Sequence, residues 1–133
     1  MAKSLKRKAK EIFRKTKSVK CPAFPDERIS FNSKGLNHLF YRTHRRPREL
    51  RQSAIRIKLL PRAIKMLQAM PIYQDEISYV VGGRKLSFWS FEGVVDERRV
   101  KVIVRQIGSG KKHFWSVIPS WKARKIKPRS AGL

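Results

Sequence analysis

Three short runs of β-branched and aromatic residues in the C-terminal half constrain the fold of this chain more than any other feature. They occupy residues 86–91, 100–107 and 113–118 and are separated by segments with glycine and charged residues. Such runs favour pleated strands, and the segments between them favour turns. A fourth run, residues 76–81, precedes a Gly-Gly pair that can supply the positive φ angles of a tight turn. The pattern predicts a four-stranded antiparallel meander.

The preceding half of the chain shows helical spacing instead. Residues 28–31 form a short extended piece, and we expect helices over residues 34–43, from Pro47 onward, and over residues 61–70. Pro61 must bend or restart the chain, because proline inside a helix loses a hydrogen bond and clashes with the preceding turn. The order of elements predicts an α+β fold with N-terminal helices packed on one face of the four-stranded antiparallel sheet.

The length of 133 residues suits one domain with a single core. We place this domain at residues 26–121, between a basic N-terminal segment, 1–25, and a basic C-terminal tail, 122–133. Residues 4–17 repeat apolar side chains at helical spacing inside a basic shell, and residues 18–25 contain two prolines, as in a linker. The first segment is either a helix that docks on the domain or grips RNA, or a solvated basic arm.

The charge of the chain limits its partners. Lysine and arginine number 33 against 9 acidic residues, which gives a formal net charge of +24. Such a surface suits nucleic acid, an anionic membrane face or an acidic protein, and composition does not separate these. No stretch approaches the roughly 18 apolar residues of a membrane span, and no secretory signal is evident. With one cysteine, Cys21, and no cluster of metal ligands, we expect a soluble cytoplasmic protein without a cofactor.

Polar residues that interrupt the apolar strands indicate where a ligand would bind. Arg105 stands in a run of valine and isoleucine, Ser116 interrupts the last strand, and His113 opens it. A guanidinium removed from water is costly unless it meets an anion, so the sheet face of Arg105 is the first candidate for a phosphate site. The alternative is a structural ion pair between Arg105 and Glu92 or Asp75.

Each of the three histidines is a candidate for proton transfer, with a solvated surface position as the alternative. His38 falls on the side of its predicted helix away from the apolar stripe. His113 follows Lys111 and Lys112, and His44 lies among arginines. Neighbouring positive charge lowers the pKa of an imidazole, which leaves it largely neutral at pH 7 and fit to act as a base.

The order of elements resembles a superfamily of metal-independent ribonucleases that includes barnase, EndoU, tRNA-cutting colicins and RelE-type toxins, and most of all its phage-associated branch. The likeness covers about residues 28–120. Its motifs are short and built from common residues: a helix of the form Lys34-Gly35-Leu36-x-His38-Leu39-x-x-Arg42-x-His44, a Leu59-Leu60-Pro61 break, and final strands bearing Val104-Arg105 and Phe114-Trp115-Ser116-Val117.

This resemblance implies cleavage of RNA by attack of the ribose 2′-hydroxyl on the adjacent phosphate, without a metal. The reaction needs a base, an acid, and positive charge on the phosphoryl oxygens. The resemblance implies proton transfer by His38, phosphate binding by Arg105 and a supporting hydrogen bond from Ser116, while His44 and His113 compete for the second proton-transfer role. The side chains expected to contact the rest of the RNA are Lys34, Arg42, Arg45, Arg46, Lys111, Lys112 and Trp115.

Two hypotheses of different classes follow. The first is an endoribonuclease toxin or effector that acts on tRNA, mRNA or rRNA and is neutralised by an acidic antitoxin or immunity protein over the Arg105 cleft. The second is a non-catalytic nucleic-acid-binding protein, for example a virion component, whose basic tails contact phosphates and whose affinity falls steeply with salt. The spatial arrangement of the candidate histidines, Arg105 and Ser116 discriminates between them.

Overall fold

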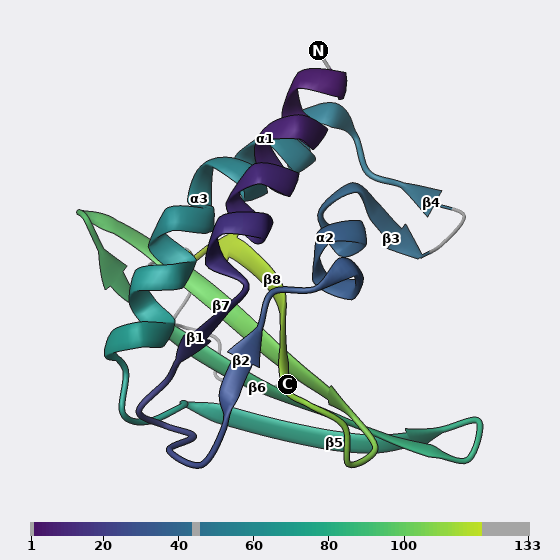
Figure 1. The fold of residues 1–133 in the computed structure, drawn as a ribbon, viewed down its shortest axis with the longest axis vertical. Helices are drawn as coiled ribbons and strands as arrows, with labels where there is room; N and C mark the ends of the chain where they lie inside the picture. Colours follow the sequence, from purple (N-terminus) through teal and green to yellow (C-terminus); the bar gives the residue numbers. More distant parts are fainter. Residues whose placement is uncertain (1, 44–45, 121–133) are drawn as a thin grey trace.

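The structure is a computed structural model of the chain and describes residues 2–43 and 46–120. Within these residues the fold is α+β, with three helices, a six-stranded sheet and a two-stranded sheet (Figure 1). In chain order the elements are α1 (Ala2–Thr16), β1 (Ser18–Lys20), β2 (Arg28–Ser30), α2 (Ser33–Phe40), β3 (Tyr41–Thr43), β4 (Arg46–Pro47), α3 (Leu50–Ala69), β5 (Asp75–Val81), β6 (Arg84–Val95), β7 (Arg98–Ile107) and β8 (His113–Pro119).

Strands β5 to β8 form the predicted antiparallel meander, each paired with the next along the chain. Gly82 and Gly83 join β5 to β6 with φ angles of 56° and 79°, as the Gly-Gly pair predicted. The turn from β6 to β7 is confined to Asp96 and Glu97, which adopt φ angles of 49° and 66°. The meander is therefore confirmed, and β6 and β7 extend beyond the apolar runs that indicated them.

The main sheet has six strands rather than the predicted four, because two short strands add to its β8 edge. β1 pairs antiparallel with β2, and β2 pairs parallel with β8 where Ser30 faces His113. Val19 and Ile29, the central residues of β1 and β2, are buried. Residues 18–25, predicted as a linker, therefore contain a strand. Strands of three residues are too short to show an alternating pattern in the sequence.

Residues predicted as two helices form the single helix α3, which continues through Pro61. Pro61 lies on the exposed side of α3, whereas Leu59, Leu60 and Ala63 are at most 1% exposed. Burying one leucine side chain contributes about 1.5–3 kcal/mol. Two such side chains offset the roughly 3 kcal/mol that proline costs inside a helix. The predicted break at Pro61 is therefore wrong.

Helix α2 begins as expected but ends at Phe40 instead of Thr43. The side-chain oxygen of Asn32 accepts a hydrogen bond from the amide of Lys34 at 3.1 Å and caps the first turn. Residues 41–43 are extended as β3 and pair with β4. The amide of Arg48 donates to the carbonyl of Phe40 at 2.8 Å, so the chain returns to the end of α2.

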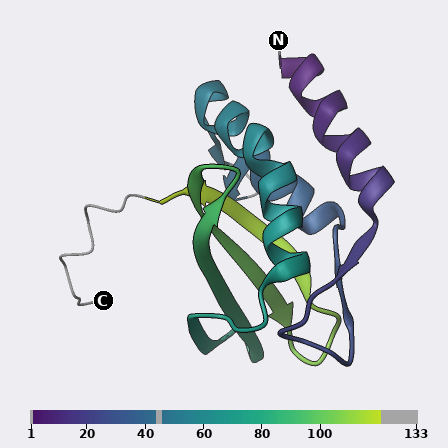
Figure 2. The same cartoon turned by 90° about the vertical axis from the view of Figure 1, so that its left-hand side faces the viewer.

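Helix α1 docks on the rest of the domain, which decides between the alternatives for the N-terminal segment. Its Ala9 and Phe13 are buried. The ring of Phe13 meets the rings of Phe31 and Phe114 edge-on, with ring centres 5.3 and 5.8 Å apart. α1 packs on α3, and α3 packs on β6, β7 and β8 (Figure 2). The helices α1 and α3 thus lie over the same face of the sheet.

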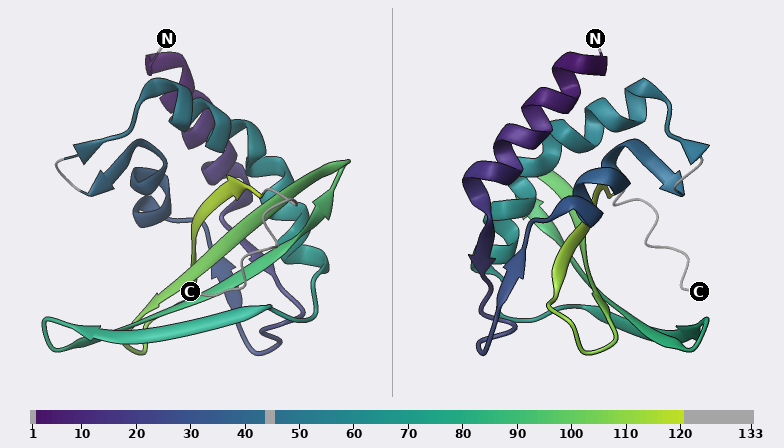
Figure 3. Two further views of the ribbon diagram at one scale, coloured as in Figure 1. Left: turned by 180° about the vertical axis from the view of Figure 1, so that it is seen from behind. Right: turned by 45° about the vertical axis from the view of Figure 1, so that its right-hand side comes forward.

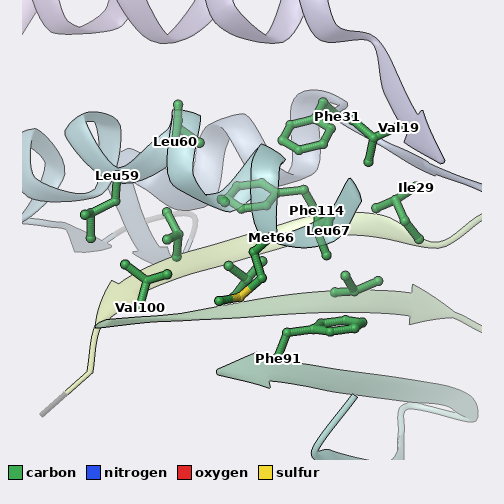
Figure 4. Close-up of a cluster of buried hydrophobic side chains, with 14 of the residues drawn as sticks. Val19, Ile29, Phe31, Leu59, Leu60, Met66, Leu67, Phe91, Val100 and Phe114 are labelled. Carbon is green, nitrogen blue, oxygen red and sulfur yellow. The ribbon is translucent and has the colours of Figure 1, made fainter. Parts of the chain in front are cut away.

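The core fills the space between α3 and this face. Leu59 and Met66 of α3 point toward Val100 and Phe91 of the sheet, Leu60 points to the other side of α3, and all five side chains are buried (Figure 4). The residues on the helical side of β7 are therefore the valines at even positions of the strand, and the residues at odd positions, Arg105 among them, face the other way.

The opposite face of the meander carries exposed apolar side chains. All seven residues of β5 are exposed, and Ile77 and Tyr79 on this strand are 58% and 48% exposed. The hairpin of β5 and β6 extends beyond the helices (Figure 3). This outer face is where the candidate site begins.

Candidate functional site

Trp115 lies beside Arg105, at a β-bulge in β8. In the pairing of β7 with β8, Val104 faces Phe114 and Ile103 faces Ser116, so Trp115 is the additional residue of the bulge. The guanidinium carbon of Arg105 lies 3.5 Å from the centre of the Trp115 ring, which places both side chains on the outer face. Strict alternation from His113 would place Ser116 on the inner face, but the extra residue makes Ser116 pair with Ile103, which lies on the outer face.

The indole of Trp115 also stacks on the imidazole of His38, which comes from α2. The two ring centres are 3.9 Å apart and the planes differ by 15°. Two flat groups at these distances cannot share one face of an indole, so His38 and Arg105 lie on opposite faces of Trp115. The structure therefore links the helix histidine and the strand arginine through one aromatic ring.

Gly35 allows α2 to approach β8 closely enough for this stack. A Cβ atom added at Gly35 would lie 2.2 Å from the carbonyl oxygen of Phe114, far inside van der Waals contact. Gly35 is one turn before His38 on α2, and Phe114 precedes Trp115 on β8. The absence of a side chain at Gly35 therefore sets the distance between the elements that carry His38 and Trp115.

Besides its contact with Trp115, Arg105 forms a hydrogen bond with His113. The Nε of Arg105 donates to the Nε2 of His113 at 3.1 Å, and His113 is only 2% exposed. Burial, followed by the charges of Arg105 and Lys34, lowers the pKa of His113 to about 4. The sequence predicted a lowered pKa from Lys111 and Lys112, but burial and Arg105 are the main causes, and a backbone hydrogen bond at Lys111 acts in the opposite direction.

His38 is held in a similar way by Arg48. The Nη2 of Arg48 lies 3.0 Å from the Nε2 of His38, and the Nε of Arg48 donates to the backbone carbonyl of His38 at 2.9 Å. Arginine has no acceptor, so Nε2 accepts and the ring proton is on Nδ1. Burial, then the charges of Arg48, Arg56 and Arg105, lowers the pKa of His38 to about 4. Both imidazoles are therefore neutral at pH 7.

Within residues 2–43 and 46–120, the arginines around His38 form no ion pair with a carboxylate. Burial, then Arg48 and Arg42, lowers the pKa of Arg56 to about 10, and its buried Nε has no hydrogen-bond partner in the described residues. The ion pairs found in residues 2–43 and 46–120 do not include Arg42, Arg48, Arg56 or Arg105. An anion that enters this cluster gains from all of these charges and relieves their mutual repulsion.

A cleft of about 280 Å³ opens beside His38 and Trp115. We call it the His38 cleft. The side chains around it provide an ammonium, a guanidinium, an amide and two hydroxyl groups in addition to the two stacked rings. It is lined by Lys34, Asn37, His38, Tyr41, Arg42, Thr43 and Trp115.

The structure does not show the alternative, an ion pair between Arg105 and Glu92 or Asp75. Glu92 instead lies 3.6 Å from Arg99 and accepts a hydrogen bond from Ser120. Asp75 accepts from the amide of Glu76. The guanidinium of Arg105 is half-buried between Trp115 and His113, without a carboxylate partner among the described residues.

Other predicted residues lie outside this arrangement. Ser116 is 5% exposed and does not line the His38 cleft, so its hydroxyl is not placed to contact a phosphate there. His44 and Arg45 fall outside the described residues. Lys112 pairs with Glu27 and lies over the rings of Phe24 and Trp89. The remaining predicted contacts, Lys111 and Arg46, are exposed.

Arg48 and Arg56 are the main residues that the sequence did not indicate. Gln52 and Arg56 are one turn apart on α3, and Arg48 lies just before the helix. Their spacing could have suggested a shared polar side, but many basic residues elsewhere in the chain have similar spacing. Asn37 and Tyr41 were likewise not predicted, because nothing local distinguishes them from other surface residues.

Two further findings concern the described residues as a whole. No group of three or more His, Cys, Asp or Glu side chains in them is arranged to hold a metal ion. No helix in the same part of the chain combines the length and the apolar character needed to cross a membrane. No protein-family model, curated protein or solved structure matches the chain, so the geometry of the His38 cleft and its neighbours is the basis for a functional assignment.

Proposed function

We propose that the protein is a metal-independent endoribonuclease, a toxin or effector, that binds an RNA phosphate at the His38 cleft and forms a 2′,3′-cyclic phosphate. The main support is the stack of His38, Trp115 and Arg105 beside other guanidinium groups that form no ion pair with a carboxylate among the described residues. An arginine cluster of this kind suits a phosphodiester, because each guanidinium offers several fixed donors to phosphoryl oxygens. A neutral imidazole in the same place supplies a base.

The proposed reaction begins with a change of partner at Arg48. A phosphate in the cleft attracts Arg48, which releases the lone pair on the Nε2 of His38. The negative charge of the phosphate also raises the pKa of His38 from about 4 toward the working pH. The freed Nε2 takes the proton of the ribose 2′-hydroxyl, and the 2′-oxygen then bonds to phosphorus.

The bond between phosphorus and the leaving 5′-oxygen breaks in the same reaction. Charge on the phosphoryl oxygens is stabilised by Arg42, which lines the cleft, and by Arg48, which contacts His38, with Arg105 behind the indole. Lys34 and Tyr41 line the cleft and carry a proton that can pass to the 5′-oxygen. Because His113 is 2% exposed, we assign it the role of positioning Arg105 rather than transferring a proton to substrate.

The test is cleavage of tRNA or total RNA by purified protein in the presence of EDTA. We expect fragments that end in 2′,3′-cyclic phosphate, and a rate loss of about 100-fold or more in Arg105→Ala and His38→Gln variants. Arg98→Ala is the matched control, because Arg98 is exposed at the start of the same strand as Arg105. RNA that stays intact under varied salt and pH, together with equal toxicity of the wild type and Arg105→Ala on expression, contradicts the proposal.

A non-catalytic nucleic-acid-binding protein is the second candidate. One observation favours it: each imidazole already accepts a hydrogen bond from an arginine, and the indole separates His38 from Arg105. On this reading the histidines only orient the arginines. The expected result is RNA that is bound with a steep salt dependence but stays intact, and His38→Gln would then change the affinity little.

The proposed ribonuclease activity also calls for an inhibitor in the producing cell. A net charge of +24 favours an acidic protein, an antitoxin or immunity protein, that covers the arginine cluster. Co-expression with the acidic product of a neighbouring reading frame should restore growth. Harmless expression of the wild-type protein alone would remove the reason for such a partner.

A further inference from the structure

A second cleft, of about 330 Å³, lies on the outer face of the meander and shares Trp115 with the His38 cleft. We call it the β5 cleft. Its floor comes from β5, β6 and β7, and the hairpin that carries it extends beyond the helices (Figure 3). The lining residues are Asp75, Glu76, Ile77, Tyr79, Phe88, Trp89, Ser90, Lys101, Ile103 and Trp115.

The β5 cleft presents an aromatic surface to solvent. The rings of Tyr79 and Phe88 stack on neighbouring strands, with centres 5.7 Å apart and planes within 19°. Tyr79 is 48% exposed and Ile77 is 58% exposed. An open, preformed surface of this kind suits a planar ligand, because one more ring can extend the stack without moving the protein.

Polar groups stand at one side of this surface. Asp75, Ser90 and Ile103 occupy one row across β5, β6 and β7, and Lys101 is two residues from Ile103 on β7. One carboxylate oxygen of Asp75 accepts from a backbone amide, and neither Asp75 nor Lys101 takes part in an ion pair among the described residues. The cleft therefore combines a stacking surface with a hydrogen-bond acceptor and donors. This suits a nucleobase, which can stack through its face and form hydrogen bonds through its edge.

We propose that the β5 cleft binds an amino-bearing base of single-stranded RNA next to the phosphate in the His38 cleft. The inference rests on the proposed function for the RNA, and continuity through Trp115 favours it over a protein ligand for this surface. The carboxylate of Asp75 accepts from the amino group of cytosine, adenine or guanine. Uracil places a carbonyl oxygen where cytosine has its amino group, so it would face the carboxylate with like partial charge.

The experiment measures binding, so that it does not depend on cleavage. Fluorescein-labelled 2′-O-methyl oligonucleotides, oligo(C) and oligo(U) of equal length, are titrated with the full chain and followed by anisotropy. The two pyrimidines have the same size and charge, and the missing 2′-hydroxyl prevents the reaction. We expect the wild type to bind oligo(C) about tenfold more tightly than oligo(U), which corresponds to one discriminating hydrogen-bonded contact.

The variants separate the base contact from general charge. Tyr79→Ala should weaken binding of oligo(C) on the order of tenfold, because stacking on one aromatic ring is lost. Val80→Ala is the matched control: Val80 is the next residue, is 69% exposed and does not line the cleft. Asp75→Asn should bring the affinities for oligo(C) and oligo(U) together, because an amide can donate as well as accept.

Equal binding of oligo(C) and oligo(U) by the wild type, or equal effects of Tyr79→Ala and Val80→Ala, overturns the inference. Those results leave the cleavage test of the proposed function untouched. Conversely, RNA that stays intact while oligo(C) is preferred and Tyr79→Ala weakens it rejects the ribonuclease and retains the base site. The two proposals thus fail on different measurements.

Discussion

Gly35 of α2 lies against the backbone carbonyl of Phe114 in β8, where a methyl group would come within 2.2 Å of the oxygen. This contact fixes how closely α2 sits over the bulge that carries Trp115. Gly35→Ala should therefore push α2 away and destabilise the protein by about 1–3 kcal/mol, the usual range for overpacking. Urea unfolding followed by tryptophan fluorescence measures the change.

Gly93→Ala is the control for this prediction. A Cβ at Gly93 meets only the terminal methyl of Met66, at 3.6 Å, so the substitution should cost little. If both glycine variants have the same unfolding midpoint, the close approach of α2 and β8 does not contribute to stability. The same preparations give RNA affinity, which we expect to fall for Gly35→Ala alone.

The lowered pKa of His113 predicts loss of stability in mild acid. Its folded-state pKa is about 4, below the ordinary value of 6.5, so the unfolded chain binds the proton more readily. The part of the unfolding free energy that depends on neutral His113 is fully present above pH 6.5 and is lost as the pH falls toward 4. The loss is about 2 kcal/mol at pH 5. Unfolding free energies of the wild type and His113→Asn at pH 7, 6 and 5 measure it.

The difference between these two proteins is the informative quantity, because carboxylates titrate near the lower end of the range in both. We expect a steeper fall for the wild type than for His113→Asn between pH 7 and 5. Parallel curves would show that His113 is not held neutral by its surroundings. His38 adds to the slope in the same direction, since its pKa is also lowered to about 4.

We expect Arg56 to lower the stability of the folded protein. It is a half-buried charge beside two other arginines, with no hydrogen-bond partner at its Nε among the described residues. Arg56→Met keeps the volume and removes the repulsion, so we expect equal or higher stability, by up to about 1 kcal/mol, together with weaker RNA binding. Thermal unfolding and the anisotropy titration report the two quantities.

Arg51→Met provides the comparison, because Arg51 is exposed near the start of the same helix. It should leave both stability and RNA affinity nearly unchanged. A large loss of stability in Arg56→Met would mean that this guanidinium forms favourable interactions in the folded protein. In that case the cluster is not poised for an anion.

The continuity of α3 predicts that Pro61→Ala stabilises the protein. Alanine restores an amide donor inside the helix and removes the clash of the ring, a gain of about 1–3 kcal/mol that is reduced by the greater freedom of the unfolded chain. The midpoint of urea unfolding should rise. A lower midpoint would indicate that Pro61 separates two helices, as the sequence had suggested.

The local pattern of residue types was sufficient to predict the meander and its first hairpin. Alternating apolar residues and the Gly-Gly pair act over short distances, and the structure has both. The extended piece predicted at residues 28–31 forms β2, but neither its place in the sheet nor the strand β1 could be predicted in this way, because β2 pairs with the distant strand β8 and β1 then pairs with β2. The single helix α3 was missed for a related reason: tertiary burial of Leu59 and Leu60 outweighs the local preference of Pro61.

For the site, the sequence indicated His38 and Arg105 from their positions in a helix and a strand, and the structure brings both to Trp115. It could not show how they meet. The bulge at Trp115 adds one residue to β8 and has no signature in composition, and the approach of α2 depends on a glycine that resembles any other. The arginines that hold the imidazoles neutral come from elsewhere in the fold, where charge alone does not distinguish them.

β8 is the last of the described strands to be synthesised, and it lies between β2 and β7 in the sheet. A nascent chain that has reached only the end of β7 has neither Trp115 nor the neighbour that β2 requires. The sheet closes, and the side chains around Trp115 come together, only after β8 has been synthesised. Completion of the six-stranded sheet and assembly of the His38–Trp115–Arg105 stack thus depend on the same segment of the chain.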